Sequence, residues 1–308
     1  MTIDDAKVGW GFAAGTFGEL VHGEIDGVPF LITLPIPWGT RATYAAVPGQ
    51  PLTVWPAHRK KVKKAAEVLL SSWGQPLEGT LVIQSALPVG KGMASSSADI
   101  VASLRAVAAA FDRELSPHLL AAVSAAVEPT DGIMFSTVVA FDPLGGRLLE
   151  RLGPPPPALI MGVLGRGRIN TENHHRQWKP YHQRHQQRIQ DALSLAREGV
   201  RRRDAALIGQ AGRISAEVEA EREPDASLDA LLAISDQEKA GAIIAHSGTV
   251  RGVVLPFSTP RAHLRRIEQR LWALQAGPVY RIPVATSPAK TLSGSCAWVV
   301  RAGSPPQN

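Results

Sequence analysis

Cysteine is nearly absent from this sequence of 308 residues, and its scarcity excludes two kinds of protein. The single cysteine, Cys296, cannot form a disulfide within the chain, so a small fold held together by disulfides is excluded. A structural zinc site built from several cysteines is excluded for the same reason. A chain of this length can bury a sizeable core without such cross-links, as one large domain or as two of ordinary size.

Long apolar runs are missing as well. No stretch approaches the roughly 18 consecutive apolar residues that indicate a membrane-spanning helix. The first residues, MTIDDAKVGWGF, are acidic and lack the apolar centre of a secretory signal. Hydrophobic residues make up 44% and charged residues 19% of the chain, which is an ordinary balance for a globular protein. We therefore expect a cytoplasmic protein with no membrane partner.

Positive charge is in excess, but its main concentration lacks aromatic residues. The formal net charge is +6, and basic residues gather in residues 184–213. No aromatic side chain in that range offers a surface for base stacking, and its apolar residues recur at roughly helical intervals. This pattern favours a solvated helix face over a nucleic-acid interface, so we expect no nucleic-acid partner. A basic surface also suits an enzyme that receives anionic nucleotides.

The alternation of strand-like and helix-like segments predicts an α+β fold. Residues 11–55 have the composition of strands and hairpins, and residues 79–87 that of a buried strand. Helical patterns cover residues 59–74, 97–111, 116–128 and 260–275, and two further helices follow a polar loop at 170–185. The segment GPPPP at 153–157 cannot continue a helix or a central strand, so it predicts a connector. We expect two domains, residues 1–153 and 158–308.

One junction between a strand and a helix is unusually rich in small residues: LPVGKGMASSSAD, residues 87–99. A helix N-terminus offers unpaired N–H groups and the positive end of the helix dipole, so it attracts anions. Gly90 and Gly92 allow close approach, the serines at 95–97 add hydroxyl donors and first-turn caps, and Lys91 adds a positive charge. The order G-x-x-x-x-G-K-[ST] of the common nucleotide loop is absent. From these features alone, tight packing and phosphate binding both explain the junction.

The spaced pattern P-x-x-x-G-[LM]-[AG]-S-S-[SA]-A, here Pro88 to Ala98, resembles the ATP-phosphate motif of the GHMP kinase superfamily. AAGTFGELVHGEIDG at 13–27 resembles that superfamily's N-terminal motif, and IAHSGTVRGVVL at 244–255 is a degraded match to its third motif. The resemblance implies a ribosomal protein S5 domain 2-like N-terminal domain and a ferredoxin-like C-terminal domain. It also implies ATP and Mg²⁺ as cofactors. The residues expected to bind the nucleotide are Pro88, Gly90, Lys91, Gly92, Met93, Ala94, Ser95, Ser96 and Ser97, with Ser96 also on magnesium.

Motifs spread over nearly the whole chain resemble the L-threonine kinase (PduX-like) branch, which serves cobalamin biosynthesis. In order they are GTFGELVHG, LPIPWGT, PVGKGMASSSADI, EPTDGIMF and AHSGTVRGVVL. Two features depart from that branch: Phe17 stands where we expect a cysteine, and residues 166–178 match only loosely. The resemblance implies phosphoryl transfer from ATP to L-threonine. Homoserine, serine or a related hydroxy amino acid is the alternative acceptor, and a nucleotide-binding sensor without turnover is the alternative of another class.

The resemblance also assigns residues to the acceptor. Glu19 and His22 lie in the N-terminal motif, and Gly248 lies in the degraded third motif, so we expect these three residues to bind substrate. The alternative for both segments is an ordinary hairpin whose glycines serve the turns, which leaves Glu19 unexplained. Thr130 either binds substrate or serves its turn.

An alcohol loses a proton as it attacks phosphorus, and a nearby carboxylate can accept that proton. Asp131 is the candidate base, because PTDGIMF resembles the segment that carries a catalytic aspartate in several members of the superfamily. The alternative is that Asp131 only caps its turn. Glu128 either ligates magnesium or ends its helix, where an acidic residue opposes the dipole. Lys91 is expected to act in catalysis as well as in phosphate binding.

Histidines gather in residues 170–185, where the chain carries four of them. Their spacing matches no established zinc pattern, so a polar loop near the active site is the favoured interpretation. Arginines in this loop are candidates to neutralise the charge of the substrate. The sequence leaves the oligomeric state open, a homodimer included.

Overall fold

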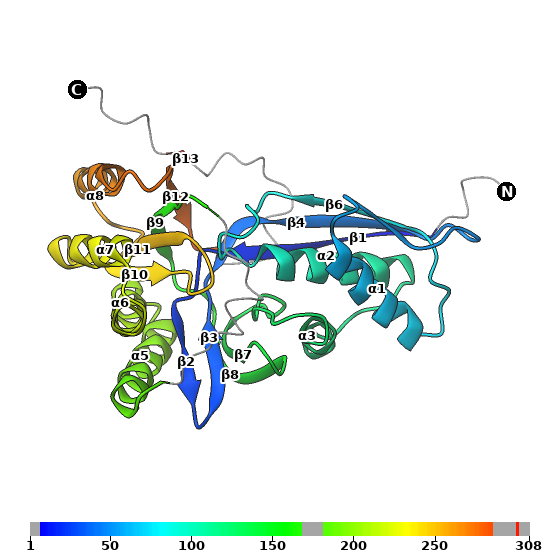
Figure 1. Ribbon diagram of the computed structural model, residues 1–308, viewed down its shortest axis with the longest axis horizontal. Coiled ribbons are helices and arrows are strands. Elements are labelled where there is room, and N and C mark those ends of the chain that lie inside the picture. Colours follow the sequence, from blue (N-terminus) through cyan, green and yellow to red (C-terminus); the bar gives the residue numbers. More distant parts are fainter. Residues whose placement is uncertain (1–6, 168–180, 286–299, 302–308) are drawn as a thin grey trace.

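The computed structural model describes residues 7–167, 181–285 and 300–301, and within these ranges the chain forms three β-sheets and seven helices (Figure 1). The first sheet contains, in spatial order, β1 (Val8–Thr16), β4 (Pro35–Ala45), β6 (Thr80–Ser85) and β5 (Thr53–Trp55). The second contains β2 (Val21–Ile25), β3 (Val28–Ile32), β7 (Val138–Asp142) and β8 (Arg147–Gly153). The third contains β10 (Gly241–Ile244), β11 (Val250–Pro256), β9 (Ala158–Leu164), β12 (Val279–Pro283) and β13 (Val300–Arg301).

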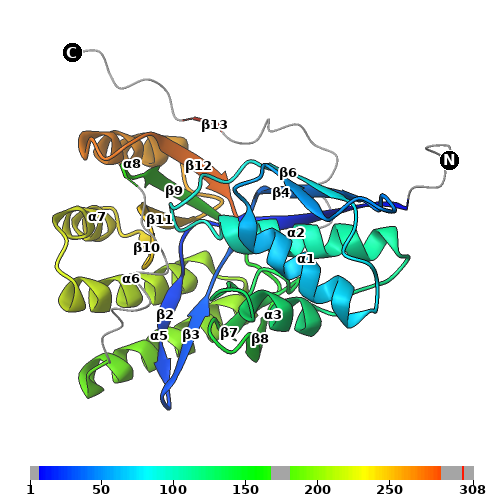
Figure 2. The ribbon, with the colours of Figure 1, turned by 45° about the vertical axis from the view of Figure 1, so that its right-hand side comes forward.

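Helix α2 (Ser95–Ala110) lies along the first sheet, with α1 (Lys60–Ser72) beside it (Figure 2). Every residue of α2 is buried except Ser96, Arg105 and Ala109, so neighbouring elements cover most sides of the helix predicted over 97–111. Its alanines bring the helix close to β1, where Gly11 faces it. A Cβ added to Gly11 would lie 2.2 Å from the carbonyl oxygen of Ala102, so this strand position has no room for a side chain.

Strand β6 is half-buried, which corrects the expectation of a fully buried strand at 79–87. Its residues alternate between the two faces of the sheet, and Val82 is 37% exposed. The reason is topological: helices cover one face of the first sheet, and an antiparallel sheet can leave its other face to water. The apolar residues of this strand therefore do not all reach the core.

Helix α3 (Pro117–Ala125) begins as the sequence predicts. The Ser116 hydroxyl accepts a hydrogen bond from the backbone N–H of Leu119, and Pro117 occupies the first turn. The helix ends at Ala125, so Glu128 lies beyond it and does not terminate it. The alternative in which Glu128 ends its helix is therefore wrong, and the contacts of Glu128 must explain its position.

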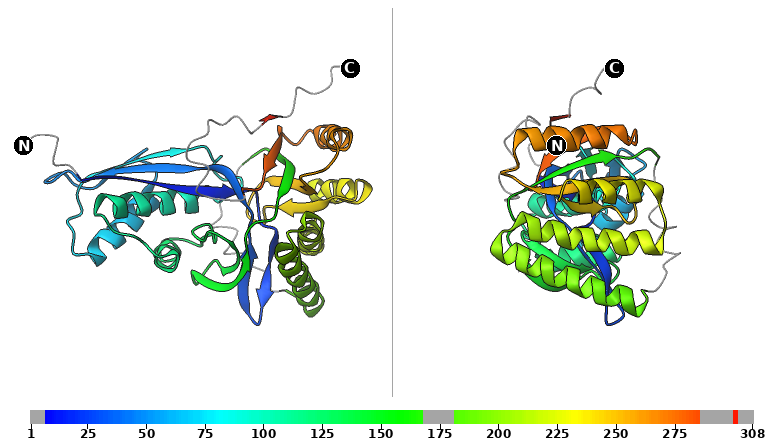
Figure 3. Two further views of the ribbon diagram at one scale, coloured as in Figure 1. Left: turned by 180° about the vertical axis from the view of Figure 1, so that it is seen from behind. Right: turned by 90° about the vertical axis from the view of Figure 1, so that its left-hand side faces the viewer.

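The third sheet has the β-α-β-β-α-β order of a ferredoxin-like fold. Between β9 and β10 the chain forms α5 (Gln183–Arg202), α6 (Ala205–Arg222) and α7 (Ala226–Gln237), and between β11 and β12 it forms α8 (Arg261–Ala273). The helices lie on the outer face of the sheet, away from the first sheet (Figure 3). The expected two-part α+β architecture is therefore confirmed.

Strand β9 is buried on both faces and links the two halves. Ile160 packs in the larger hydrophobic cluster, which also contains Phe17 and residues of the first two sheets, whereas Met161 packs in a second cluster beneath α7 and α8. This alternation follows from the two-residue period of a strand. The larger cluster therefore draws on both halves of the chain, and the boundary expected at 153–158 stays a prediction.

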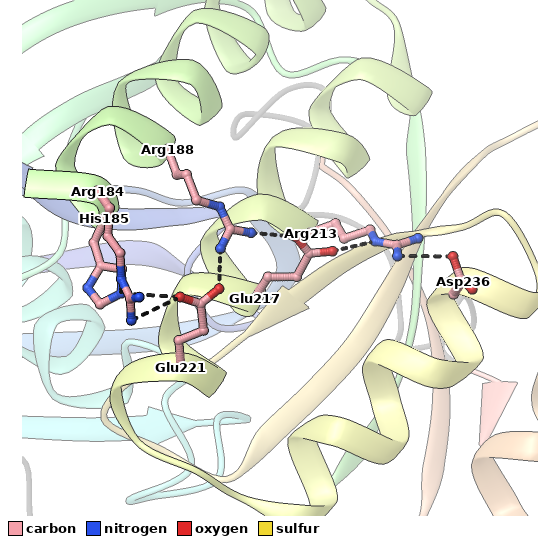
Figure 4. A network of polar contacts seen from close by, with 7 residues as sticks. All are labelled: Arg184, His185, Arg188, Arg213, Glu217, Glu221 and Asp236. Atoms are coloured by element: carbon pink, nitrogen blue, oxygen red, sulfur yellow. Dashed lines mark hydrogen bonds and ion pairs between the residues drawn. The ribbon is translucent and has the colours of Figure 1, made fainter.

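Most of the basic residues of 184–213 lie on helices and are paired with acids. Arg188 on α5 contacts Glu217 and Glu221 on α6, and Arg213 contacts Glu217 and Asp236 (Figure 4). Such pairing accounts for much of the positive charge and supports the interpretation of a solvated, salt-bridged face. Within the part of the chain that the structure describes, no helix is both long and apolar enough to cross a membrane.

Candidate active site

A cavity of about 460 Å³ opens at the N-terminus of α2, within the usual size range of small-molecule sites. Its walls include the loop that precedes α2, the N-terminal end of α1 and the segment after α3. Most of the nucleotide-binding residues expected from the sequence line it: Gly90, Gly92, Met93, Ala94, Ser95, Ser96 and Ser97. Glu19, Glu128 and Asp131 line the cavity too. The structure thus brings three carboxylates to the loop of residues 90–94, which we call the phosphate loop.

The phosphate loop is shaped by three left-handed residues at alternate positions. Gly90, Gly92 and Ala94 have φ angles of 71°, 79° and 56°. Alternating left-handed and other conformations turn successive N–H groups toward one concave side, which is an anion-binding arrangement. Ala94 occupies the N-cap of α2 and forms no side-chain cap. The first N–H groups of α2 therefore receive no cap from that side chain, and the prediction that the serines cap this turn is wrong.

Two of these serines instead bind the carboxylates that follow α3. The Ser96 hydroxyl donates a hydrogen bond to Glu128, and the Lys61 ammonium contacts the other oxygen of that carboxylate. The Ser97 hydroxyl donates to Asp131 Oδ2 at 3.0 Å and accepts from the backbone N–H of Asp131. The first turn of α2 thus fixes both acids at the edge of the loop.

Asp131 lies among other acids, and its pKa is raised to about 7. Burial is the main cause, the neighbouring carboxylate of Glu19 adds to it, and the hydrogen bond from Ser97 opposes it. Glu128 raises the pKa of Asp131 further. A carboxyl group with a pKa near neutrality can both accept and release a proton under ordinary conditions, which is what a general base requires.

Sequence analysis missed the basic side of the cavity. Arg59, Lys60 and Lys61 stand at the N-terminal end of α1 and line the cavity opposite the phosphate loop. Cations at a helix N-terminus oppose the helix dipole, so the run RKK at 59–61 is unfavourable for the helix itself. That cost is a signal of an anionic ligand in the sequence, beside the amphipathic pattern of the helix. Arg59 is held by an ion pair with Asp99 at 2.6 Å, and burial raises the pKa of Asp99.

The N-terminal motif reaches the cavity through Glu19 alone. Glu19 Oε2 accepts a hydrogen bond from the backbone N–H of His246 at 2.8 Å and contacts His246 Nδ1 at 3.1 Å. His22 does not line the cavity. Its ring packs against the ring of His246, with centroids 4.4 Å apart, and its Nδ1 hydrogen-bonds with the Tyr181 hydroxyl. The N-terminal motif at 13–27 and the third motif at 244–255 are therefore in contact. Of Glu19 and His22, only Glu19 lines the cavity.

Lys91 and Gly248 lie behind the loop rather than in the cavity. The Lys91 ammonium donates to the carbonyl groups of Gly165 and Gly167, and among the described residues it does not line the cavity. A Cβ on Gly248 would lie 2.3 Å from the Lys91 carbonyl oxygen, so this glycine lets the β10–β11 turn pack against the loop. In this structure Lys91 and Gly248 therefore help to hold the loop in place, and their expected roles toward nucleotide and substrate stay predictions.

Two more expected residues stand outside the cavity, and one unexpected residue is inside. Pro88 does not line it, and Thr130 is buried, with its N–H donating to the carbonyl of Pro143. Ser247, which belongs to the degraded third motif but was given no role of its own, lines the cavity, whereas its neighbour Gly248 does not. Residues 170–180, most of the histidine-rich loop expected near the site, lie outside the described residues, and so does Cys296.

Comparison with known proteins agrees with this arrangement. The sequence model described as GHMP kinases N terminal domain matches residues 60–138. L-threonine kinase of Salmonella typhimurium is 30% identical over 246 residues, which cover 77% of this chain and 80% of that protein. The structure of homoserine kinase from Cytophaga hutchinsonii aligns over 93% of this chain and 96% of that one, with a TM-score of 0.67 and 16% identity. Phosphomevalonate kinase of Streptococcus pneumoniae, solved with phosphomevalonate and AMPPNP, aligns over 87% and 96%, with a TM-score of 0.65 and 16% identity.

The fold, the loop at the start of α2 and these matches define the class of protein. The chain belongs to the GHMP kinase superfamily and is an ATP-dependent kinase that acts on a hydroxyl group. Within that superfamily it belongs to the L-threonine kinase branch.

Replacing Gly248 with alanine should disturb the loop from behind. The added Cβ would overlap the backbone of Lys91 and Gly92, so we expect a loss of about 1–3 kcal/mol in the free energy of unfolding, typical of overpacking. We also expect weaker binding of ATP, measured by calorimetry. Gly49→Ala is the matched control, because Gly49 has φ 76° but nothing within 4 Å of an added Cβ. ATP binding by Gly248→Ala equal to that of the control would contradict the supporting role.

Proposed function

We propose that this enzyme transfers the γ-phosphoryl group of ATP to the hydroxyl group of an amino acid, and that the acceptor is L-threonine. The product, O-phospho-L-threonine, would serve the nucleotide loop of cobalamin. The observation that carries the proposal is the position of Asp131, held by Ser97 in the first turn of the helix that begins at the phosphate loop. The relatives named L-threonine kinase support the choice of acceptor.

The residues of the cavity suit each part of the transfer. The concave loop of residues 90–94, together with Arg59, Lys60 and Lys61, would neutralise the triphosphate. The acceptor hydroxyl would form a bond to the γ-phosphorus as the bond to the bridging oxygen of ADP breaks. Asp131 would take the hydroxyl proton and release it to water after ADP leaves. Phosphoryl transfer depends mainly on positioning and charge neutralisation, and this arrangement supplies both.

The same cavity fits a magnesium ion bound with the nucleotide. Mg²⁺ prefers hard oxygen ligands and keeps several waters, so one or two protein oxygens suffice when phosphates supply the rest. Ser96 and Glu128 offer a hydroxyl and a carboxylate oxygen in direct contact. When bound, the ion would neutralise charge on the phosphates.

Ser96→Ala should separate metal-dependent from metal-independent nucleotide binding. Loss of one oxygen ligand should weaken binding of ATP with Mg²⁺ by about tenfold, the scale of one hydrogen bond to a charged group, and leave binding of free ATP nearly unchanged. Calorimetric titration with and without Mg²⁺ measures both. Ser71→Ala, on the exposed side of α1, is the control. An equal loss of ATP affinity with and without Mg²⁺ would show that Ser96 is not a magnesium ligand.

The pH dependence tests Asp131 as the base. With a pKa of about 7, Asp131 is protonated below neutrality and cannot accept a proton, so kcat/KM should rise with pH and level off above 7. Asp131→Asn should lower kcat by about 10²–10⁴-fold, leave ATP affinity nearly unchanged, and abolish the rise. Asp112→Asn, an exposed position after α2, is the matched control. Unchanged turnover in Asp131→Asn would leave Asp131 as a turn residue only.

A panel of acceptors tests the substrate. In a coupled assay of ADP release, kcat/KM for L-threonine should exceed the values for homoserine and L-serine. Preference for another of these alcohols would keep the reaction and replace the substrate. Binding of ATP with no turnover on any acceptor would instead favour a nucleotide sensor.

A further inference from the structure

A second cavity of about 390 Å³ lies between the edge strand β1 and the segment 132–139. It adjoins the candidate active site through consecutive residues, because Asp131 lines the first cavity and Gly132 lines the second. Thr16, at the end of β1, also lines the second cavity, and its N–H donates to the carbonyl of Met93 in the phosphate loop. The residues proposed to bind ATP and Mg²⁺ and to act as the base do not line this second cavity.

Arg105 gives the second cavity a positive charge with no acidic counterpart. It is the one charged residue of the stretch Ile100–Ala110 of α2, and it donates to the carbonyl groups of Phe12 at 2.6 Å and Met134 at 3.2 Å. No acidic residue lines the cavity, and across the described ranges no carboxylate forms an ion pair with Arg105. Burial lowers the pKa of Arg105. A partly buried cation without a counterion is costly, which points to an anionic ligand.

The rest of the lining suits a small, partly apolar acid. Trp10, Phe12 and Phe135 give apolar surface, while Thr16, Thr33 and Thr137 give hydroxyl groups. The Thr137 Oγ1 is buried and has no hydrogen-bond partner among the described residues. Buried polar atoms are normally paired, so this hydroxyl is available to a ligand. The guanidinium of Arg105 uses two of its nitrogens on backbone carbonyls and retains further N–H donors.

We propose that the second cavity is a binding site for a small carboxylate, held by the Arg105 guanidinium. Arginine is the side chain best suited to grip a planar carboxylate, because its N–H donors form a fork. Two sources can supply this chemistry. One is the carboxylate of the acceptor amino acid, an assignment that rests on the function proposed above, with the hydroxyl directed past Gly132 toward Asp131. The other is a separate carboxylic acid, bound beside the segment that carries Asp131.

Comparing L-threonine with L-threoninamide isolates the carboxylate. If the acceptor is the source, Arg105→Met should lower kcat/KM for L-threonine by between about 10- and 100-fold, the scale of hydrogen bonds to charged groups, and hardly change the value for the amide. Arg105→Lys should recover part of the loss through its charge. Arg113→Met is the matched control, because Arg113 stacks on Trp73 at the far end of α2. A selective loss for L-threonine identifies the acceptor as the ligand.

Binding of butyrate tests the site without any turnover. Calorimetry should show butyrate binding to the wild-type protein and at least tenfold weaker binding to Arg105→Met, whichever source is correct. Unchanged kinetics with L-threonine, together with this loss of butyrate binding, identifies a separate acid. Because Arg105 also binds two backbone carbonyls, Thr137→Val serves as a second, isosteric variant that should weaken butyrate binding a few-fold.

Failure of this proposal and failure of the proposed function have different signatures. A wild-type enzyme that does not phosphorylate L-threonine overturns the acceptor, yet butyrate binding still reports on the second cavity. Equal butyrate binding by the wild type, Arg105→Met and Thr137→Val, with no change in the ratio of L-threonine to L-threoninamide activity, overturns the carboxylate site. Thermal melting of each variant shows that the comparison is made on folded protein.

Discussion

The clamping of the phosphate loop between the two halves of the molecule is the constraint on which the rest of the site depends. On one side, β1 and the residues after it donate N–H groups of Thr16 and Gly18 to the carbonyls of Met93 and Gly92. On the other, the β10–β11 turn donates N–H groups of Thr249 and Val250 to the carbonyl of Lys91. The carbonyl groups of residues 91–93 in the loop accept these hydrogen bonds. The loop and the start of α2 line the cavity, where the positive end of the helix dipole attracts anions.

Electrostatics in the cavity follows from the same geometry. Three carboxylates approach the loop from two segments of the chain: Glu19 follows β1, and Glu128 and Asp131 follow α3. Their mutual repulsion and their burial keep the pKa of Asp131 near neutrality. Lys61 and the serines of α2 hold two of these acids in place. A nucleotide with its metal ion would enter a site in which both signs of charge are already arranged, so little reorganisation would accompany the reaction.

Sequence reasoning found the parts of the site that are local in the chain. Ser96 and Ser97 lie on the helix that the loop predicts, and Glu128 and Asp131 meet them in the cavity. Where a side chain's direction depends on distant packing, the motifs say less. Lys91 contacts the carbonyls of residues 165 and 167, and Arg59 on α1 lines the cavity although it belongs to no motif. A charged residue in a glycine-rich loop has no intrinsic direction, because the loop's orientation is set by what packs behind it.

The sequence by itself determined the α+β class, the buried helix after the loop and the kind of chemistry, because hydrophobic period, small residues and spaced motifs act over short stretches. Only the tertiary structure decided which face of each segment meets the ligand. It paired Glu19 with His246 across most of the chain, placed Gly248 behind the loop, and left Arg105 facing a second cavity without an acid. Such long-range contacts depend on how the two halves pack together, and short-range patterns in the sequence do not encode that packing in readable form.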